Sequence, residues 1–189
     1  MDNTYHPPAP AWQVERWFNT PTPPSLESLR GKVIVLEAFQ MLCPGCVSHG
    51  LPQALRVHTG FPRDQVAVIG LHTVFEHREV MTHEALQAFL HEYRIPFPVG
   101  VDRPAPRGPI PQTMRAYAMQ GTPTLTLIDR LGRVRMQHFG QVSDLVLGAQ
   151  IGGLLGEPRT IPMDDAEAPA SAGCTDEGCA IDDNARKAE

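Results

Sequence analysis

Apolar residues gather in four short runs that have the length and composition of buried strands. These runs span residues 33–39, 66–71, 95–101 and 124–128. The first run is apolar enough for a strand that is buried on both faces. After the fourth run, turn residues at 129–132 precede Val134, Met136 and His138, which alternate with polar positions. We therefore predict that the last two strands pair as an antiparallel hairpin.

Between these runs the apolar residues follow a helical spacing. Helices are predicted at 47–58, after a Thr82 cap, after Pro111 and after a Ser143 cap. Pro52 should kink the first helix, because proline has no N–H to donate. Since strands alternate with helices, we predict an α/β domain with parallel strands and helices on both faces of the sheet. The closing hairpin would add an antiparallel edge.

Composition divides the chain of 189 residues into one domain and two appendages. Residues 1–24 are rich in proline, and the alternation of Trp12, Val14 and Arg16 within them predicts a short edge strand. Residues 25–156 hold the strands and helices of the domain. Residues 157–189 are acidic and carry few large apolar side chains, so we expect a flexible tail that cannot offset its own ordering entropy.

The charge balance narrows the possible partners. A net charge of −5 and an isoelectric point near 5.9 argue against a nucleic-acid partner, because such a surface needs concentrated Lys and Arg. No apolar run approaches the roughly 18 residues of a membrane span, and the N-terminal segment has no apolar core of a secretory signal. We therefore expect no membrane partner and a cytoplasmic location.

The sequence Cys43-Pro44-Gly45-Cys46 directly follows the most apolar predicted strand. Pro44 suits the first turn of a helix, so the strand should deliver Cys43 to a helix N-terminus. There the unpaired N–H groups and the helix dipole favour a thiolate and lower a thiol pKa from about 8.5. We predict a redox-active pair, with Cys43 as nucleophile and Cys46 as resolving thiol. The alternatives are two buried apolar residues or half of a zinc site.

Three motifs resemble the thioredoxin-like superfamily, particularly its thiol-disulfide reductases and redoxins of the TlpA and ResA type. They are residues 39–46 with the CPGC motif, residues 121–124 (Gly-Thr-Pro-Thr), which look like the family's cis-proline loop, and residues 129–134, which look like its hairpin. The resemblance implies a thioredoxin-like fold with a central mixed sheet flanked by helices. It also implies an inserted helix–strand unit at 82–101 and a flexible C-terminal tail.

The resemblance extends to residues around the two cysteines. Pro123 is expected to be cis and to face them, with Thr122, Pro44 and Gly45 offering a surface to an extended substrate; an ordinary trans proline is the alternative. Glu37 stands where thioredoxins place a buried acid. Burial would raise the pKa of its carboxyl and let it exchange a proton with the resolving thiol, unless Glu37 faces solvent on an edge strand.

Three residues depart from the family pattern. Leu42 replaces the usual aromatic residue before the first cysteine, so the entry surface is altered. Gln40 stands where peroxiredoxins have a threonine, which makes peroxidase activity a weaker alternative. ResA-like proteins carry a glutamate shortly after the second cysteine; here the nearest polar residue is His49, which we interpret as a helix-surface residue.

A second cysteine pair, Cys174 and Cys179, lies in the predicted tail. A mobile dithiol could exchange with the Cys43–Cys46 disulfide as an internal relay; the other interpretation gives the tail thiols no specific role. Two pairs could also supply the four ligands of a structural zinc site.

The sequence thus predicts a thiol-disulfide oxidoreductase acting on disulfides of protein or small-molecule substrates. It needs neither a metal nor an organic cofactor, because the two thiols carry the electrons. The electron donor and the direction stay open, since potentials of such pairs run from about −270 to −120 mV. A redox-inert peptide-binding module is the alternative from a different functional class.

Overall fold

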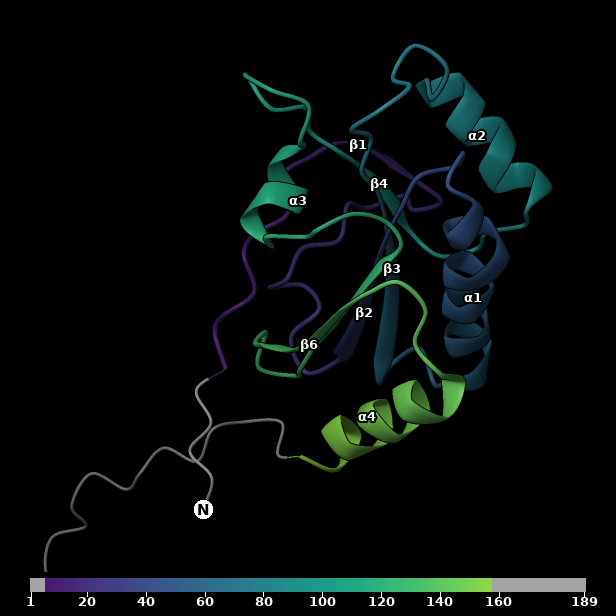
Figure 1. The fold of residues 1–189 in the computed structure, drawn as a ribbon. Coiled ribbons are helices and arrows are strands. Elements are labelled where there is room, and N and C mark those ends of the chain that lie inside the picture. The colour runs from purple at the N-terminus through teal and green to yellow at the C-terminus, as the bar shows by residue number, and fades with distance from the viewer. Residues whose placement is uncertain (1–5, 158–189) are drawn as a thin grey trace, which may run out of the picture.

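A mixed sheet of six strands forms the centre of the molecule, in the order β1-β4-β3-β2-β5-β6 (Figure 1). The computed structural model describes residues 6–157. The strands are β1 (Val14–Phe18), β2 (Val33–Phe39), β3 (Val66–His72), β4 (Val99–Asp102), β5 (Thr124–Ile128) and β6 (Val134–Phe139). Every strand predicted from the sequence is therefore confirmed, although β4 is shorter than the run at 95–101.

Strand directions follow from the connections. β2 pairs in parallel with β3, and β3 with β4, because helices connect these strands. β5 pairs antiparallel with β2, β6 pairs antiparallel with β5, and β1 pairs antiparallel with β4 at the opposite edge. The predicted hairpin turns at Gly132, whose φ of 74° suits glycine. The Asp129 carboxylate accepts the N–H groups of Leu131 and Arg133 in this turn.

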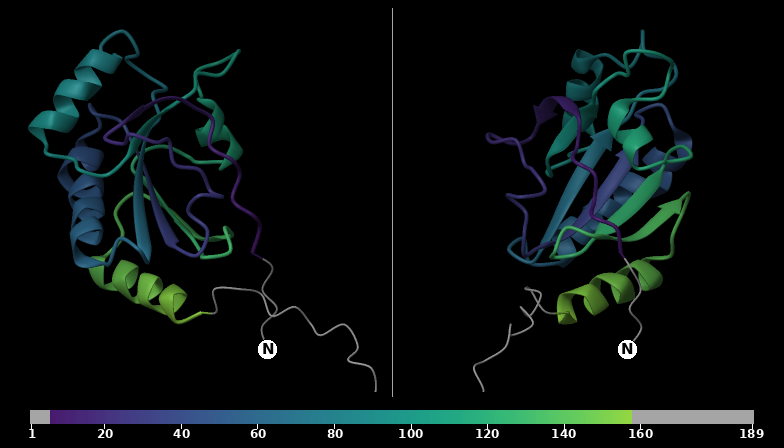
Figure 2. Two further views of the ribbon diagram at one scale, coloured as in Figure 1. Left: turned by 180° about the vertical axis from the view of Figure 1, so that it is seen from behind. Right: turned by 90° about the vertical axis from the view of Figure 1, so that its left-hand side faces the viewer.

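Helices cover both faces of the sheet, as predicted (Figure 2). They are a π-helical turn at Cys46–Gly50, α1 (Leu51–Gly60), α2 (His83–Glu92), α3 (Gln112–Ala116) and α4 (Asp144–Gly156). The predicted starts of α2, α3 and α4 are confirmed, although the Ser143 side chain makes no capping hydrogen bond. The Thr82 hydroxyl accepts the N–H of Ala85 at the start of α2, Pro111 precedes α3, and Ser143 precedes α4.

Alternate side chains of β2 supply the two layers of the core. Val33, Val35 and Phe39 pack with residues of α1, α2 and α4, whereas Ile34, Leu36 and Ala38 pack with residues of α3 and the N-terminal segment. Every residue of β2 is buried, as expected for a central strand. Because side chains alternate along a strand, Glu37 lies on the same face as Val35 and Phe39. A carboxyl therefore occupies a core position on the α1 side.

The start of the first helix differs from the prediction. Pro52 does not kink the middle of a continuous α-helix; it lies in the first turn of α1, where a missing N–H costs little. The irregular segment is the π-helical turn before it, in which the N–H of Leu51 donates to the carbonyl of Cys46, five residues back. A proline at 52 cannot donate to the carbonyl of Ser48, so a regular α-helical ladder cannot run through this segment.

The N-terminal segment packs along the α3 face of the sheet. Trp12 Nε1 donates to the hydroxyl of Tyr117 over 3.0 Å, and that hydroxyl donates to the carbonyl of Pro10 over 2.8 Å. The boundaries proposed at residues 24 and 156 stay predictions, and residues 158–189 lie outside the described part of the chain. Among the described helices, none has the length and apolar character to cross a membrane.

We predict that His72 makes the stability of the protein sensitive to acid. Burial lowers the pKa of His72 to about 4, against about 6.5 in the unfolded chain. Its contribution is therefore complete above pH 6.5 and is lost as the pH falls toward 4, by about 2 kcal/mol at pH 5. Urea denaturation at pH 7.5 and pH 5 should show a smaller loss for His72→Phe than for the wild type.

Glu37 has the opposite effect on the free energy of unfolding as the pH falls. Its carboxyl binds a proton more tightly in the folded protein, so protonation stabilises the fold. This effect is common to the wild type and the variant, so their difference isolates His72. An equal loss of stability in both proteins would contradict the prediction.

Candidate active site

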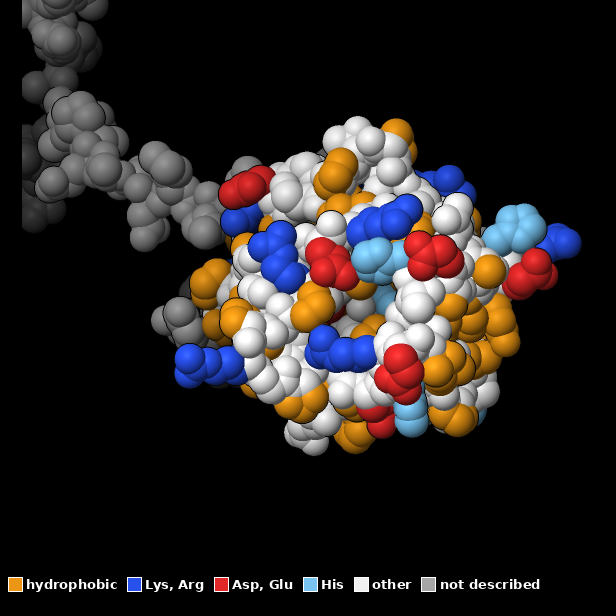
Figure 3. Space-filling view, turned by 90° about the horizontal axis from the view of Figure 1, so that it is seen from above, with side chains coloured by type: hydrophobic (Ala, Val, Ile, Leu, Met, Phe, Trp, Pro, Cys, Tyr) orange, Lys and Arg blue, Asp and Glu red, His pale blue; other side chains and the backbone are white. Residues whose placement is uncertain are grey.

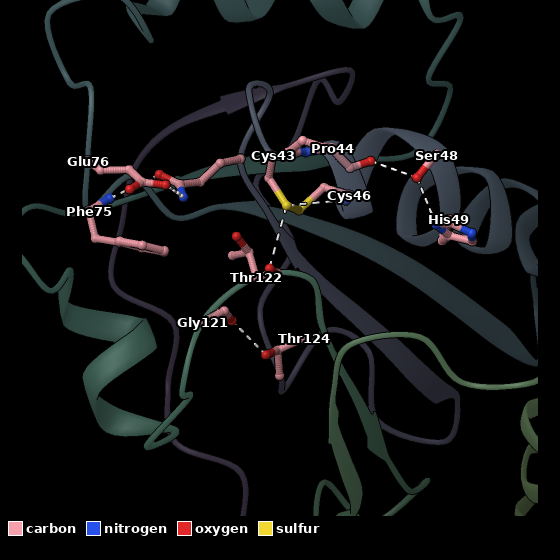
Figure 4. The surroundings of a disulfide bond; sticks show 11 residues. Cys43, Pro44, Cys46, Ser48, His49, Phe75, Glu76, Gly121, Thr122 and Thr124 are labelled. Atoms are coloured by element: carbon pink, nitrogen blue, oxygen red, sulfur yellow. Dashed lines mark hydrogen bonds between the residues drawn. A yellow bond between two sulfur atoms is a disulfide. The ribbon is translucent and has the colours of Figure 1, made fainter.

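The two cysteines of the CPGC motif lie where β2 leads into a helix. The N–H of Cys43 donates to the carbonyl of Gln40 in a tight turn after β2, and helical backbone begins at Pro44. Cys43 and Cys46 form a disulfide, with their Cα atoms 5.2 Å apart (Figure 4). Cys46 is fully buried, whereas Cys43 is only partly buried. Cys43 is therefore the sulfur that a substrate can reach.

The backbone around Cys43 favours negative charge on its sulfur. The N–H of Cys46 points at Cys43 Sγ over 3.2 Å, and the helix N-terminus adds its dipole. A donor aimed at a thiolate favours the charged form, and hence a lower thiol pKa. This arrangement is the one that the sequence predicts for a nucleophile at position 43.

The loop before β5 packs against the CPGC motif. The Thr122–Pro123 peptide bond is cis, and the Thr122 carbonyl lies 3.5 Å from Cys43 Sγ. Packing is close, since a Cβ added to Gly45 would lie 3.3 Å from Pro123 Cδ. The sheet topology brings this loop to the CPGC motif, because β5 runs antiparallel to β2. The start of β5 thus lies beside the end of β2.

Glu37 is buried beneath the helix that carries the cysteines. Its side chain is on the inner face of β2 with 1% exposure, and Oε1 has no hydrogen-bond partner within the described residues. Burial raises the pKa of this carboxyl to about 8. The buried interpretation of Glu37 is therefore confirmed against the edge-strand alternative.

A cavity of about 230 Å³ opens next to Glu37. Its lining comes from the helix that follows the CPGC motif and from the loop that leads into α4. The lining includes Glu37, His49, Gln53, Arg56 and Asp144. Arg56 Nε and Nη2 donate to the Asp144 carboxylate over 2.9 and 3.0 Å, which ties α1 to the start of α4.

Two residues shape the site in ways that were not predicted from the sequence. Gly50 faces Glu37, because a Cβ at this position would collide with the Glu37 carboxyl and lie 3.1 Å from Pro123 Cβ. Gln40, taken only as a departure from peroxiredoxins, is buried and holds the loop after β3. Its Oε1 accepts the N–H of Phe75 and its Nε2 donates to Glu76, both over 3.3 Å. Neither role leaves a signal in the spacing of residues along the chain.

A second cavity lies at the end of the molecule that Figure 3 shows from above. Side chains of both charges and histidines surround a hollow on this face. The cavity has a volume of about 330 Å³, and its lining includes Glu15, Arg78, His83 and Glu84. His83 Nε2 lies 2.9 Å from Glu15 Oε1. The lining includes neither the CPGC motif nor the cis-proline loop, so this cavity is separate from the active site.

The remaining predicted site residues have different outcomes. Leu42, which replaces the family's aromatic residue, is 52% exposed beside Cys43. Cys174 and Cys179 lie outside the described residues, so the relay and the four-cysteine zinc site stay predictions. Within residues 6–157, no group of three or more His, Cys, Asp or Glu side chains is placed to hold a metal ion.

Solved structures of high similarity share this fold. The thioredoxin-like superfamily protein SPOA0173 is 62% identical, with a TM-score of 0.79 over 80% of this chain and 97% of that one. The chain belongs to the thioredoxin-like superfamily. A thiol-disulfide isomerase from Corynebacterium glutamicum is 52% identical, with a TM-score of 0.76 over 84% of this chain and 100% of that one. With its CPGC disulfide in this fold, the protein is a thiol-disulfide oxidoreductase.

Other comparisons are more distant. No protein-family model matches the chain. Among curated proteins, the chain is 29% identical over 131 residues to the protein DipZ of Mycobacterium bovis and of Mycobacterium tuberculosis. The match covers 68% of this chain but only 18% of DipZ. The chain therefore corresponds to one part of those longer proteins.

We predict that Gly50 cannot be replaced without disturbing Glu37. Gly50→Ala should lower the free energy of unfolding by about 1–3 kcal/mol, because the new methyl group overpacks the site against the Glu37 carboxyl and Pro123. Gly60→Ala is the matched control, since a Cβ there meets nothing within 4 Å. Denaturant unfolding of both variants measures the difference, and equal stability of the two would show that position 50 is not crowded.

Proposed function

We propose that the chain reduces or exchanges disulfides in proteins, with Cys43 as the attacking thiol and Cys46 as the resolving thiol. The observation that carries this assignment is the difference in burial of the two sulfurs. Cys43 is partly exposed beside the cis-proline loop, whereas Cys46 is fully buried on the Glu37 side of the sheet. Only Cys43 can meet a substrate sulfur, and only Cys46 is positioned to act from within.

The reducing direction takes two steps. The Cys43 thiolate attacks one sulfur of the substrate disulfide, whose S–S bond breaks, and the other substrate sulfur leaves as a thiolate. Glu37 is then a carboxylate, because it gave its proton to Cys46 when the disulfide was opened. Cys46 returns this proton to the Glu37 carboxylate and attacks Cys43 Sγ. The mixed disulfide breaks, the second substrate thiolate leaves, and two electrons have passed from the dithiol to the substrate. In the opposite direction Glu37 returns the proton to Cys46.

The cis-proline loop is the proposed binding surface for the substrate backbone. The Thr122 carbonyl lies 3.5 Å from Cys43 Sγ, and Pro123 packs on Gly45. An extended segment placed along Thr122 would present its own sulfur to Cys43, in the manner of a strand added to an edge. Pro44 is exposed at the same end of the helix and completes this surface.

We assign the chain to the TlpA and ResA type on the inserted unit formed by α2 and β4. This unit adds a parallel strand to β3 and a helix to the α1 face. The disulfide between Cys43 and Cys46 favours a redox role over a zinc-ligand role, because a metal needs the thiolate form. The cytoplasmic location and the lack of nucleic-acid and membrane partners stay predictions from composition.

Replacing each cysteine in turn tests the proposed roles. In a Cys174→Ser/Cys179→Ser background, Cys46→Ser should accumulate a mixed disulfide between Cys43 and insulin whose disulfides are intact, because the resolving step is blocked. Cys43→Ser should form none, and should lose insulin reduction. Mass spectrometry of alkylated adducts identifies the cysteine that is joined. Trapping through Cys46 in the Cys43→Ser variant would reverse the assignment.

Replacing Glu37 tests the proton step. Because the Glu37 carboxyl keeps its proton up to about pH 8, it can protonate Cys46 when a reductant opens the disulfide. The rate of reduction, expressed per thiolate of dithiothreitol, should therefore fall above pH 8 in the wild type. Glu37→Gln should react about a hundredfold more slowly at pH 7 and show no step near pH 8.

The exposed carboxylate of Glu92 provides the control for this experiment. Glu92→Gln should follow the wild-type pH profile. A Glu37→Gln protein that keeps both the wild-type rate and the step near pH 8 would assign the titrating group to another residue.

A further inference from the structure

The loop that follows β3 lies beside the CPGC motif. β2 and β3 are parallel neighbours, so the segments after them leave the sheet at the same end. The N–H of Thr73 donates to the carbonyl of Phe39 over 3.0 Å, which joins this loop to the last residue of β2. Figure 4 shows Phe75 and Glu76 among the residues around the disulfide of Cys43. A substrate that reaches Cys43 therefore comes close to this loop as well as to the cis-proline loop.

Three contacts fix the backbone of this loop. Val74 packs against the core on the α1 face of the sheet, and Phe75 packs against the core on the α3 face. The N–H of Phe75 also donates to Gln40 Oε1 over 3.3 Å. Because the Gln40 side chain has only 1% exposure, water does not compete for this bond. The position of residues 74–76 relative to β2 is therefore well defined.

Gln40 also holds the carboxylate of Glu76 in place relative to the nucleophile. Gln40 Nε2 donates to Glu76 Oε1 over 3.3 Å, and the Gln40 carbonyl accepts the N–H of Cys43 over 3.1 Å. One residue thus joins the turn that carries Cys43 to the carboxylate of Glu76. A hydrogen bond to an ionised acceptor is stronger than one to a neutral acceptor, so the negative charge stays beside the CPGC motif.

The charge of Glu76 is available to a substrate. The side chain is exposed, and within residues 6–157 no Lys, Arg or His forms an ion pair with it. Arg78, two residues further along the loop, instead donates to the carbonyl of Pro109 over 2.5 Å. The carboxylate therefore keeps room for a cation that comes from outside the described residues.

The residues next to Cys43 at the entrance carry no charge of their own. They are Leu42, Pro44 and Thr122, of which the first two are exposed. Complementary charge between two partners speeds their encounter and selects one partner over another. A carboxylate beside this uncharged entrance therefore favours a substrate that brings a cation.

We propose that Glu76 is a specificity residue, which selects protein disulfides that have a Lys or Arg side chain close to the attacked sulfur, and that Gln40 positions it. The cation of the substrate pairs with the Glu76 carboxylate while the substrate sulfur meets Cys43. Electrons and protons move as in the two steps of the proposed mechanism, and the pairing changes only the relative rates of different substrates. The inference rests on the proposed function, because it names the substrate class of the same site.

Three cyclic peptides with one disulfide each test this selection. They differ only in the two residues that flank one cysteine, which are lysines, glutamines or glutamates. The measured quantity is the ratio of the rate constants of the reduced full chain with the lysine and glutamine peptides. Intrinsic reactivity of the peptides cancels when this ratio is compared between proteins. At low salt the ratio should be about threefold higher for the wild type than for Glu76→Gln.

Two further measurements identify the charge as the cause. Glu76→Lys should shift the preference toward the glutamate peptide, because the sign of the charge is reversed. In 1 M NaCl the differences between the proteins should largely disappear, since salt screens exposed charges. Glu76→Gln still offers a carbonyl oxygen to Gln40, so its fall in the ratio reports the lost charge. Equal ratios for the wild type, Glu76→Gln and Glu76→Lys would overturn the selection.

Glu79→Gln is the matched control, because it removes the same charge from an exposed position in the same loop. It should keep the wild-type ratio, and a fall as large as that of Glu76→Gln would show an effect of net charge alone. The role of Gln40 is tested in a Gln40→Met background, where the effect of Glu76→Gln should be smaller than in the wild type. Effects of equal size in both backgrounds would contradict the positioning role of Gln40.

The glutamine peptide and insulin separate this inference from the proposed function. If the wild type reduces neither of them, the proposed function fails and the selection fails with it. If the wild type reduces both but shows the same peptide ratios as Glu76→Gln, only the selection by charge fails.

Discussion

The active site depends on the position of β2 between a parallel and an antiparallel neighbour. Parallel pairing with β3 leaves the end of β2 free to turn into the helix that begins at Pro44. Antiparallel pairing with β5 sets the loop before β5 at that same end, so that Pro123 meets Gly45. A slip of one residue in either register would turn Glu37 to the opposite face of the sheet. One set of backbone hydrogen bonds thus places the cysteines, the cis-proline loop and the buried acid together.

The surroundings of Cys43 favour the charged form of its thiol, whereas the surroundings of Glu37 favour the neutral form of its carboxyl. Cys43 lies at a helix N-terminus with a backbone N–H aimed at its sulfur, which favours the thiolate. Glu37 lies a few residues earlier on an apolar strand without a partner for Oε1 among the described residues, which favours the neutral carboxyl. In the disulfide form the Glu37 carboxyl is therefore neutral near pH 7, and once the disulfide is opened the surroundings of Cys43 favour its thiolate. A disulfide exchange that needs both an attacking thiolate and an available proton has them in one place.

Much of this arrangement could be predicted from local patterns, and some of it could not. The apolar run of β2, the helix start at Pro44 and the burial of Glu37 follow from residue types and periodicity. The π-helical turn before Pro52 was not predicted, because apolar spacing locates a helix but does not show whether its N–H groups bond four or five residues back. The interpretation of His49 as a helix-surface residue is confirmed, because its side chain is exposed on the π-helical turn. The roles of Gly50 and Gln40 depend on contacts between segments that are distant in the sequence.

The sequence by itself determined the order of strands and helices, the chemistry of the CPGC pair and the presence of an acid within the central strand, because these follow from neighbours within a few residues. Only the tertiary structure decided which residues surround that acid. The approach of Pro123 to Gly45 and Gly50, and the ion pair between Arg56 and Asp144, join segments that lie far apart along the chain. Such contacts depend on strand pairing and on helix packing, and local residue patterns do not encode the distances that result.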